Sequence, residues 1–186
     1  MKIPVGVSNR HVHLKEETFK ELFGDVSLTK RNDLTQPDEY AANETVMIKT
    51  AKDKIEKVRI LGPFREYNQV EISKTDAYHL GINPPVRKSG DLENSESITL
   101  VGPQKEIFIQ NGVIISERHI HMDTSFAKEN NFGEDEKVYV KISGVKPGII
   151  TASIKTSDNA YLELHLDTDD ANAFLLKNGD EVEILK

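Results

Sequence analysis

The sequence predicts a mainly β protein with a few short helices. Short segments rich in Val, Ile and Leu recur along the chain, and Gly-Pro or Asn-Gly pairs separate several of them. An eight-residue pattern also occurs twice, at residues 7–14 and 115–122. Closely spaced short strands are typical of barrels and sandwiches, and the repeat indicates an internal duplication.

Strands are expected where apolar and β-branched residues concentrate or alternate with polar ones. Helices are expected at residues 15–23, ending at Gly24, and at 125–130, with Asp123 or Thr124 as the cap. A third helix is expected at residues 167–177. The expected strands cover residues 45–49, 57–61, 69–73, 97–101, 107–109, 113–115, 137–142, 149–154, 160–166 and 181–185.

Each copy of the repeat contains a His-x-His sequence preceded by Ser-x-Arg. His11 and His13 form the first pair, and His119 and His121 form the second. Residues i and i+2 of a strand share one face, so each pair places two imidazoles side by side. Neutral imidazole is a common zinc ligand, and each pair can supply half of a metal site. A lone His-x-His can also be a hydrogen-bonded structural pair, but its duplication favours two bound ions.

Two further residues are candidates for the third ligand of each site. Glu71 shares a strand face with Gln69 and could complete a His, His, Glu set, or be an ordinary exposed carboxylate. His165 lies at a strand end and is the available third nitrogen for the second pair, although such a histidine can also be a core residue. His79 lies on a helix-like segment without a partner motif, and we leave it outside both sites.

Composition narrows the function classes. The net charge of −7 argues against a nucleic-acid partner, because affinity for the phosphate backbone requires a basic face. No apolar run is long enough to predict a membrane span, and no signal peptide is visible, so we expect a cytoplasmic protein. Without cysteine, any metal must bind to nitrogen and oxygen. The basic residues in 49–65 could attract an anion or simply form a solvated surface.

Three motifs occur together: the two Ser-x-Arg-His-x-His sequences, Gly62-Pro63-x-Arg65-x-x-x-Gln69-Val70-Glu71, and the run from His165 to Ala173. In this combination essentially the whole chain resembles the phosphotransacylases of bacterial metabolosomes, the phosphate propanoyltransferase family. The resemblance implies exchange of an acetyl or propanoyl group between coenzyme A and inorganic phosphate. It also implies two small β-barrels capped by short helices, one from residues 1–8 with 117–186 and the other from residues 9–116.

The resemblance also implies roles for individual residues. One zinc ion would bind His11, His13 and Glu71, and another would bind His119, His121 and His165. Arg65 matches the phosphate-binding arginine of the family. Family members in metabolosomes carry an N-terminal targeting extension that does not precede Lys2 here, which favours a cytoplasmic enzyme over a microcompartment enzyme. The residues that match coenzyme A contacts are Val7, Ser8, Asn9, Lys52, Arg59 and Asn172.

The expected mechanism is direct displacement at a site with two divalent ions. The ion on His11, His13 and Glu71 would bind the coenzyme A sulfur, while the second ion and Arg65 would orient phosphate. Zinc is the expected metal, although nitrogen and oxygen ligands also accept cobalt, manganese and nickel. The sequence is compatible with a homo-oligomer but does not specify one.

Two other functions fit the same residues. A di-metal hydrolase would use a metal-activated water in place of phosphate, on an acyl-CoA or another substrate. A non-catalytic β domain would use zinc only for stability. Three protein ligands per ion leave a coordination position open, which favours catalysis over a closed structural site.

Overall fold

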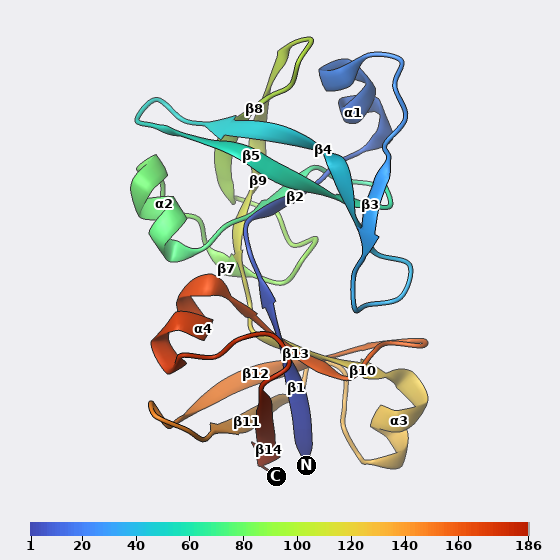
Figure 1. Cartoon of the computed structure of the whole chain (residues 1–186), viewed down its shortest axis with the longest axis vertical. Coiled ribbons are helices and arrows are strands. Elements are labelled where there is room, and N and C mark those ends of the chain that lie inside the picture. Colours follow the sequence, from blue (N-terminus) through green and yellow to red (C-terminus); the bar gives the residue numbers. More distant parts are fainter. Residues whose placement is uncertain (186) are drawn as a thin grey trace. The chain divides into compact units, whose positions relative to one another are not determined.

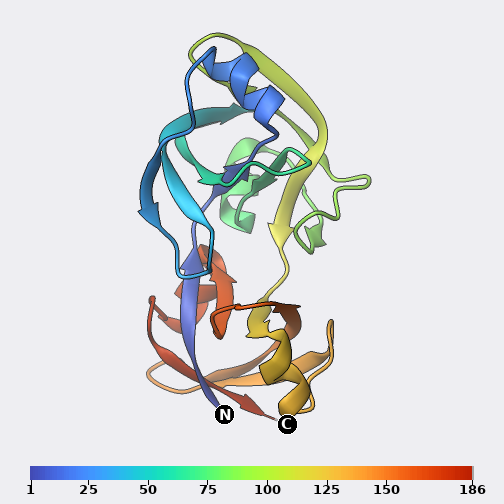
Figure 2. The same ribbon diagram turned by 90° about the vertical axis from the view of Figure 1, so that its right-hand side faces the viewer.

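Residues 1–185 are described by a computed structural model, in which they form two closed six-stranded β-barrels with four short helices (Figures 1 and 2). The chain divides into two compact units, Met1–Asn9 with Glu117–Lys186 and Arg10–Ser116. The predicted fold class, mainly β with two helix-capped barrels, is therefore confirmed. Among residues 1–185, no helix combines the length and the apolar character that crossing a membrane requires.

One barrel combines the N-terminal strand with the C-terminal third of the chain. Figure 1 shows β1, in blue, among the yellow to red strands of that unit. The strands follow the order β1-β13-β10-β12-β11-β14, and β14 pairs back with β1 to close the barrel. The elements are β1 (Lys2–Ser8), β10 (His119–Asp123), α3 (Thr124–Glu129), β11 (Lys137–Ile142), β12 (Gly148–Ser157), β13 (Glu163–Asp167), α4 (Thr168–Phe174) and β14 (Glu181–Leu185).

The other barrel is built from the central segment. Its ring runs β4-β5-β2-β6-β9 and closes through β8, which pairs with both β9 and β4. Strand β3 pairs with β4, and β7 pairs with β9. The elements are β2 (His11–His13), α1 (Glu16–Phe23), β3 (Lys30–Asp33), β4 (Tyr40–Lys49), β5 (Lys54–Gly62), β6 (Gln69–Glu71), α2 (Lys74–Leu80), β7 (Val86–Arg87), β8 (Glu96–Val101) and β9 (Glu106–Ser116).

The two His-x-His strands have equivalent neighbours in their barrels. Strand β2 is parallel to β5 and antiparallel to β6, and β10 is parallel to β12 and antiparallel to β13. The middle residue of each motif, Val12 or Ile120, is fully buried in the core of its barrel. Because side chains alternate along a strand, burial of this residue turns both flanking histidines to the opposite face.

The predicted break at Asn111-Gly112 is wrong, because β9 continues through it. Opposite this point Glu96 pairs with Val113 whereas Ile98 pairs with Ile109, so the longer segment of β9 bulges against β8. A Cβ on Gly112 would lie 2.6 Å from the Ile109 side chain and 3.2 Å from the Asn68 carbonyl oxygen. The glycine is therefore needed for close packing rather than for a hairpin turn.

The helices begin where expected, but one of them ends early. Asp123 caps α3 by accepting hydrogen bonds from the backbone of Ser125 and Phe126, and the Ser125 hydroxyl contributes most to lowering the pKa of Asp123 to about 2. The helix predicted at residues 167–177 stops at Phe174, because Leu175 adopts a left-handed conformation with φ of 58°.

Candidate metal centres

The first candidate centre brings together His11, His13 and Glu71 in the central barrel. Their potential ligand atoms all lie within 4.8 Å of one another. Glu71 Oε2 is 3.5 Å from His11 Nε2, and Glu71 Oε1 is 3.9 Å from His13 Nε2. The two histidine side chains are almost fully buried, at 6% and 7% exposure.

Strand pairing explains why Glu71 meets the first histidine pair. In the antiparallel register of β2 and β6, His11 lies opposite Glu71 and His13 lies opposite Gln69. Side chains that lie opposite each other on one face of such a pair are close neighbours. The Glu71 side chain is only 12% exposed and faces the two histidines rather than open solvent.

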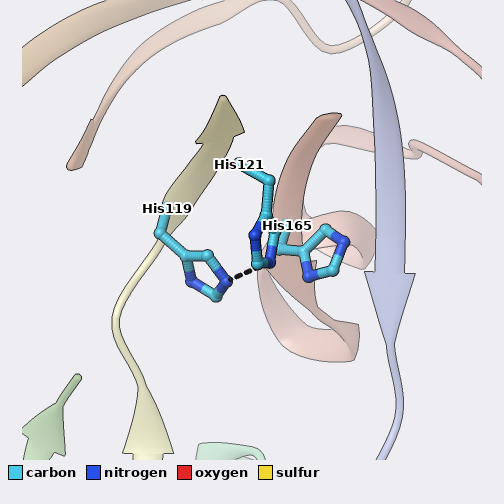
Figure 3. A group of neighbouring side chains, drawn as sticks. All are labelled: His119, His121 and His165. Atoms are coloured by element: carbon cyan, nitrogen blue, oxygen red, sulfur yellow. Dashed lines mark hydrogen bonds between the residues drawn. The ribbon is translucent and has the colours of Figure 1, made fainter. Parts of the chain in front are cut away.

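The second candidate centre consists of His119, His121 and His165 in the other barrel (Figure 3). The Nε2 atoms of His119 and His121 are 3.2 Å apart. The centroids of the His165 and His121 rings are 4.5 Å apart. Strand β13 supplies His165 opposite His119, the same register that places Glu71 opposite His11. Sequence reasoning therefore named three residues that meet in each barrel.

Both sets of side chains fit a divalent ion in donor type and spacing. Two ligands bound to zinc at 2.0–2.1 Å in tetrahedral geometry lie about 3.3 Å apart. The separation of 3.2 Å between His119 Nε2 and His121 Nε2 matches this value, and 3.5 Å between His11 and Glu71 is close to it. His119 Nδ1 contacts the Glu117 carbonyl oxygen at 2.8 Å, so its Nε2 is the atom available to an ion.

An arginine–aspartate ion pair accompanies each centre. Arg10 donates two hydrogen bonds to Asp76 at 2.8 and 2.6 Å, and Arg118 donates two to Asp170 at the same distances. Each arginine directly precedes its His-x-His, and each aspartate lies in the first turn of the helix after the third-ligand strand. The hydrogen bonds that Arg10 and Arg118 donate to Asp76 and Asp170, respectively, raise the pKa of the two guanidinium groups.

Arg65 lies in the central barrel, in the loop that follows β5. Its backbone N–H donates to the carbonyl oxygen of Leu14, the residue after His13, at 2.9 Å. Its Nη2 donates to Glu39 Oε1 at 2.5 Å, while its buried Nε has no hydrogen-bond partner among the described residues. The Arg65 side chain is 34% exposed, and a planar guanidinium with donors beyond the one used by Glu39 is suited to binding an anion such as phosphate.

Two of the basic residues in the segment 49–65 are committed to other contacts. Lys49 pairs with Glu106 and Lys54 pairs with Glu56, so these lysines belong to an ordinary salt-bridged surface. His79 lies on the exposed face of α2, 3.5 Å from Asp53 Oδ2, and joins neither histidine cluster.

The candidate coenzyme A residues are divided between the two units. Val7 and Ser8 end β1, directly after the residue that pairs with His165, and Asn172 is exposed on α4. In the central barrel, Arg59 pairs with His11 in the parallel register, and Lys52 Nζ donates to the Tyr78 carbonyl oxygen at 2.8 Å. Asn9 is exposed at the end of the first segment of its unit.

Three residues beside the centres were not identified from the sequence: Asp76 and Asp170 form the ion pairs described above, and Glu163 Oε2 lies 2.7 Å from His165 Nε2. Gln69 was expected on the strand face of Glu71 but was given no role, and it donates to Glu71 Oε1 at 2.6 Å. The spacing of these residues in the sequence could nevertheless have pointed to them, because it is the same in both copies of the repeat. Each aspartate follows the third candidate ligand by five residues, and Gln69 and Glu163 precede it by two.

Comparison with known proteins gives a consistent result over almost the whole chain. Residues 4–177 match the family model for phosphate propanoyltransferase. A phosphate propanoyltransferase of Thermotoga maritima is 48% identical over 99% of this chain and 89% of its own length. Relatives with the same name from Priestia megaterium and Escherichia fergusonii are 47% and 45% identical, covering 96% and 92% of this chain and 83% and 82% of their own lengths.

Proposed function

This chain belongs to the phosphate propanoyltransferase family, and we propose that it catalyses acyl-CoA + phosphate = acyl phosphate + coenzyme A, with an acetyl or propanoyl group. The family match across residues 4–177 is the observation that supports this activity most directly. At the broadest level, the chain is therefore an enzyme of the phosphate acyltransferase type. The acyl group, the metal ions and the order of events are finer parts of the proposal.

In the proposed reaction a phosphate oxygen attacks the thioester carbonyl carbon, and the bond from that carbon to sulfur breaks. The electron pair of this bond leaves on the coenzyme A sulfur. Arg65 would bind the phosphate, because its planar guanidinium can contact two phosphate oxygens together and its side chain is 34% exposed. Glu39 holds the other side of this guanidinium and orients it.

The two candidate centres would each hold one divalent ion, most simply zinc. His11, His13 and Glu71 form one ligand set, and His119, His121 and His165 form the other. Bound ions would supply Lewis-acid stabilisation for the negative charge that develops on the carbonyl oxygen and the sulfur. Three protein ligands in each set leave room for a further ligand, as in catalytic zinc sites.

The reaction is proposed to proceed without an acyl-enzyme. The chain contains no cysteine, and Arg65 can hold phosphate as the attacking group. Direct displacement requires both substrates to bind before product leaves, so initial-rate plots against acetyl-CoA and phosphate should intersect. Parallel plots together with a trapped acyl-protein would indicate a covalent intermediate and contradict this part of the proposal.

The decisive assay measures free thiol release from acetyl-CoA and propanoyl-CoA with and without phosphate. A phosphate acyltransferase should release thiol only when phosphate is present and should form one acyl phosphate per thiol. Equal release without phosphate would indicate the hydrolase instead. Metal analysis of the same sample, before and after chelation, tests the ions. A catalytic metal should remove activity with the fold retained, whereas a purely structural zinc should unfold the protein.

A further inference from the structure

Each third-ligand strand places a second polar side chain on the same face, two residues before the candidate ligand. In β6 this pair is Gln69 and Glu71, and in β13 it is Glu163 and His165. The strand registers are equivalent, because Gln69 lies opposite His13 and Glu163 lies opposite His121. The duplicated barrels therefore offer two versions of one arrangement, a ligand and a neighbour that contacts it.

Glu163 contacts one particular nitrogen of His165. Its Oε2 lies 2.7 Å from Nε2, and the carboxylate is buried, with the whole residue only 6% exposed. Figure 3 shows one ring nitrogen of His165 facing the other two imidazoles while the second nitrogen points away from them. With Nε2 bonded to Glu163, the nitrogen that faces His121 and His119 is Nδ1.

Gly6 provides the space for this contact. Strand β1 is parallel to β13, and Gly6 pairs with His165 in that register. A Cβ on Gly6 would lie 2.6 Å from Cδ and Oε2 of Glu163 and 3.0 Å from Cδ2 of His165. Such separations are too short for real contacts, so a larger residue would displace the Glu163 carboxylate from the edge of the His165 ring.

The corresponding pair in the central barrel reverses the two roles. The Gln69 Oε1 atom accepts a hydrogen bond from the Gly90 N–H at 2.7 Å, which directs Nε2 towards Glu71 Oε1 and Ser89 Oγ. Here the neutral side chain is the neighbour and the carboxylate is the ligand. In the other barrel the neutral imidazole is the ligand and the carboxylate is the neighbour. Each centre thus contains one carboxylate, which is a candidate ligand in one case and lies behind a candidate ligand in the other.

We propose that Glu163 is a positioning residue that holds His165 with hydrogen on Nε2 and the lone pair of Nδ1 directed at the ion. This inference rests on the metal-dependent function proposed above. A carboxylate behind a ligating histidine fixes its tautomer and its ring orientation, and increases the electron density of the ligating nitrogen. Glu163 also supplies the negative charge that three imidazoles lack, so both centres would carry the same formal charge when loaded with a divalent ion.

The test compares zinc affinity in the wild type and in Glu163→Gln, Gly6→Ala and Glu183→Gln by competition with a chelator. Loss of a partner behind a ligating histidine commonly costs about 10–100-fold in metal affinity. Glu163→Gln should lower the affinity for one of the two ions by that factor and leave the affinity for the other unchanged. Gly6→Ala should lower the affinity for the same ion without changing the carboxylate itself. Glu183→Gln, exposed on β14 of the same barrel, should bind both ions like the wild type.

Nitrogen-15 spectra of the histidine rings give a readout that does not depend on activity. In the metal-free wild type, at a pH where imidazole is neutral, His165 should carry its hydrogen on Nε2. In the zinc-loaded protein Nδ1 should be the metal-bound nitrogen and Nε2 should remain protonated. Zinc bound through Nε2, or equal affinity of the wild type and Glu163→Gln for both ions, would overturn the inference. A wild type that binds no zinc would instead refute the metal-dependent function itself.

Discussion

Arg118 forms a bidentate ion pair with Asp170, and this contact joins the residue directly before β10 to the helix after β13. The two hydrogen bonds measure 2.8 and 2.6 Å and span 52 positions of the sequence. Arg10 and Asp76 form the equivalent pair across 66 positions in the central barrel. In each barrel, the arginine before the His-x-His strand is therefore joined to the helix after the third-ligand strand by an ion pair that involves no candidate ligand.

Replacing Asp76 by Asn should lower the free energy of unfolding by about 1–3 kcal/mol, the cost of weakening a largely buried hydrogen bond to a charged group. The Asp76 side chain is only 6% exposed and also takes part in the cap of α2. Asp170→Asn should cost less, because that side chain is 20% exposed and better solvated. Urea denaturation measures both values, with exposed Asp33→Asn as the control. A larger loss in Asp170→Asn would contradict the ranking.

The histidine clusters could be predicted from the sequence because they depend on local periodicity. His-x-His fixes two imidazoles on one face wherever the middle residue is buried, and Val12 and Ile120 both are. Glu71 and His165 could be named only as candidates of a suitable residue type, and the family resemblance assigned them to the two sets. Their positions opposite His11 and His119 depend on strand pairing between distant segments, which local periodicity does not specify.

The contacts behind the candidate ligands could not be predicted in this way. Glu163 reaches His165 only because Gly6, far away in sequence, leaves space beside it. The exposed strand β3 (Lys30–Asp33) was missed for a related reason. All four of its residues are exposed, so no apolar alternation marks the segment, and its pairing with β4 defines it. Such features depend on tertiary neighbours rather than on local propensity.

Replacing Arg65 by Lys should raise the KM for phosphate roughly 10- to 100-fold, since charge-assisted hydrogen bonds contribute about 1.5–3 kcal/mol. Lysine retains the charge but loses the planar pair of donors. The KM for acetyl-CoA and the metal content should stay near wild-type values. Initial rates at varied phosphate measure the effect, with Arg31→Lys on exposed β3 as the matched control. An unchanged phosphate dependence would remove Arg65 from the anion site.

Replacing His119 by Ala should remove about one metal ion per chain, since two imidazoles from different strands make a much weaker site than three. The ion on His11, His13 and Glu71 should remain, because those residues belong to the other barrel. Elemental analysis after dialysis measures the stoichiometry. His79→Ala is a matched control, because His79 is exposed and joins neither cluster. Loss of metal in the control, or full retention in His119→Ala, would show that the second centre is misplaced.

Glu44 should make the stability of the central barrel depend on pH. Burial acts to raise the pKa of Glu44, but hydrogen bonds from the Thr29 hydroxyl and backbone N–H outweigh it and lower the pKa below its ordinary value of 4.5. A lowered pKa in the folded state stabilises the fold above the unfolded value, and this contribution is lost as pH falls through the folded pKa.

Glu44→Gln should therefore be less stable than the wild type at neutral pH, and the difference should close as the pH falls from about 5.5 to about 3. Urea denaturation at a series of pH values measures this difference. Thr29→Val removes the hydroxyl donor but keeps the backbone N–H, so in that background the same Glu44→Gln change should have a smaller effect with a weaker pH dependence. A Glu44→Gln effect that is the same size at all pH values would mean that the charge of Glu44 contributes nothing to the fold.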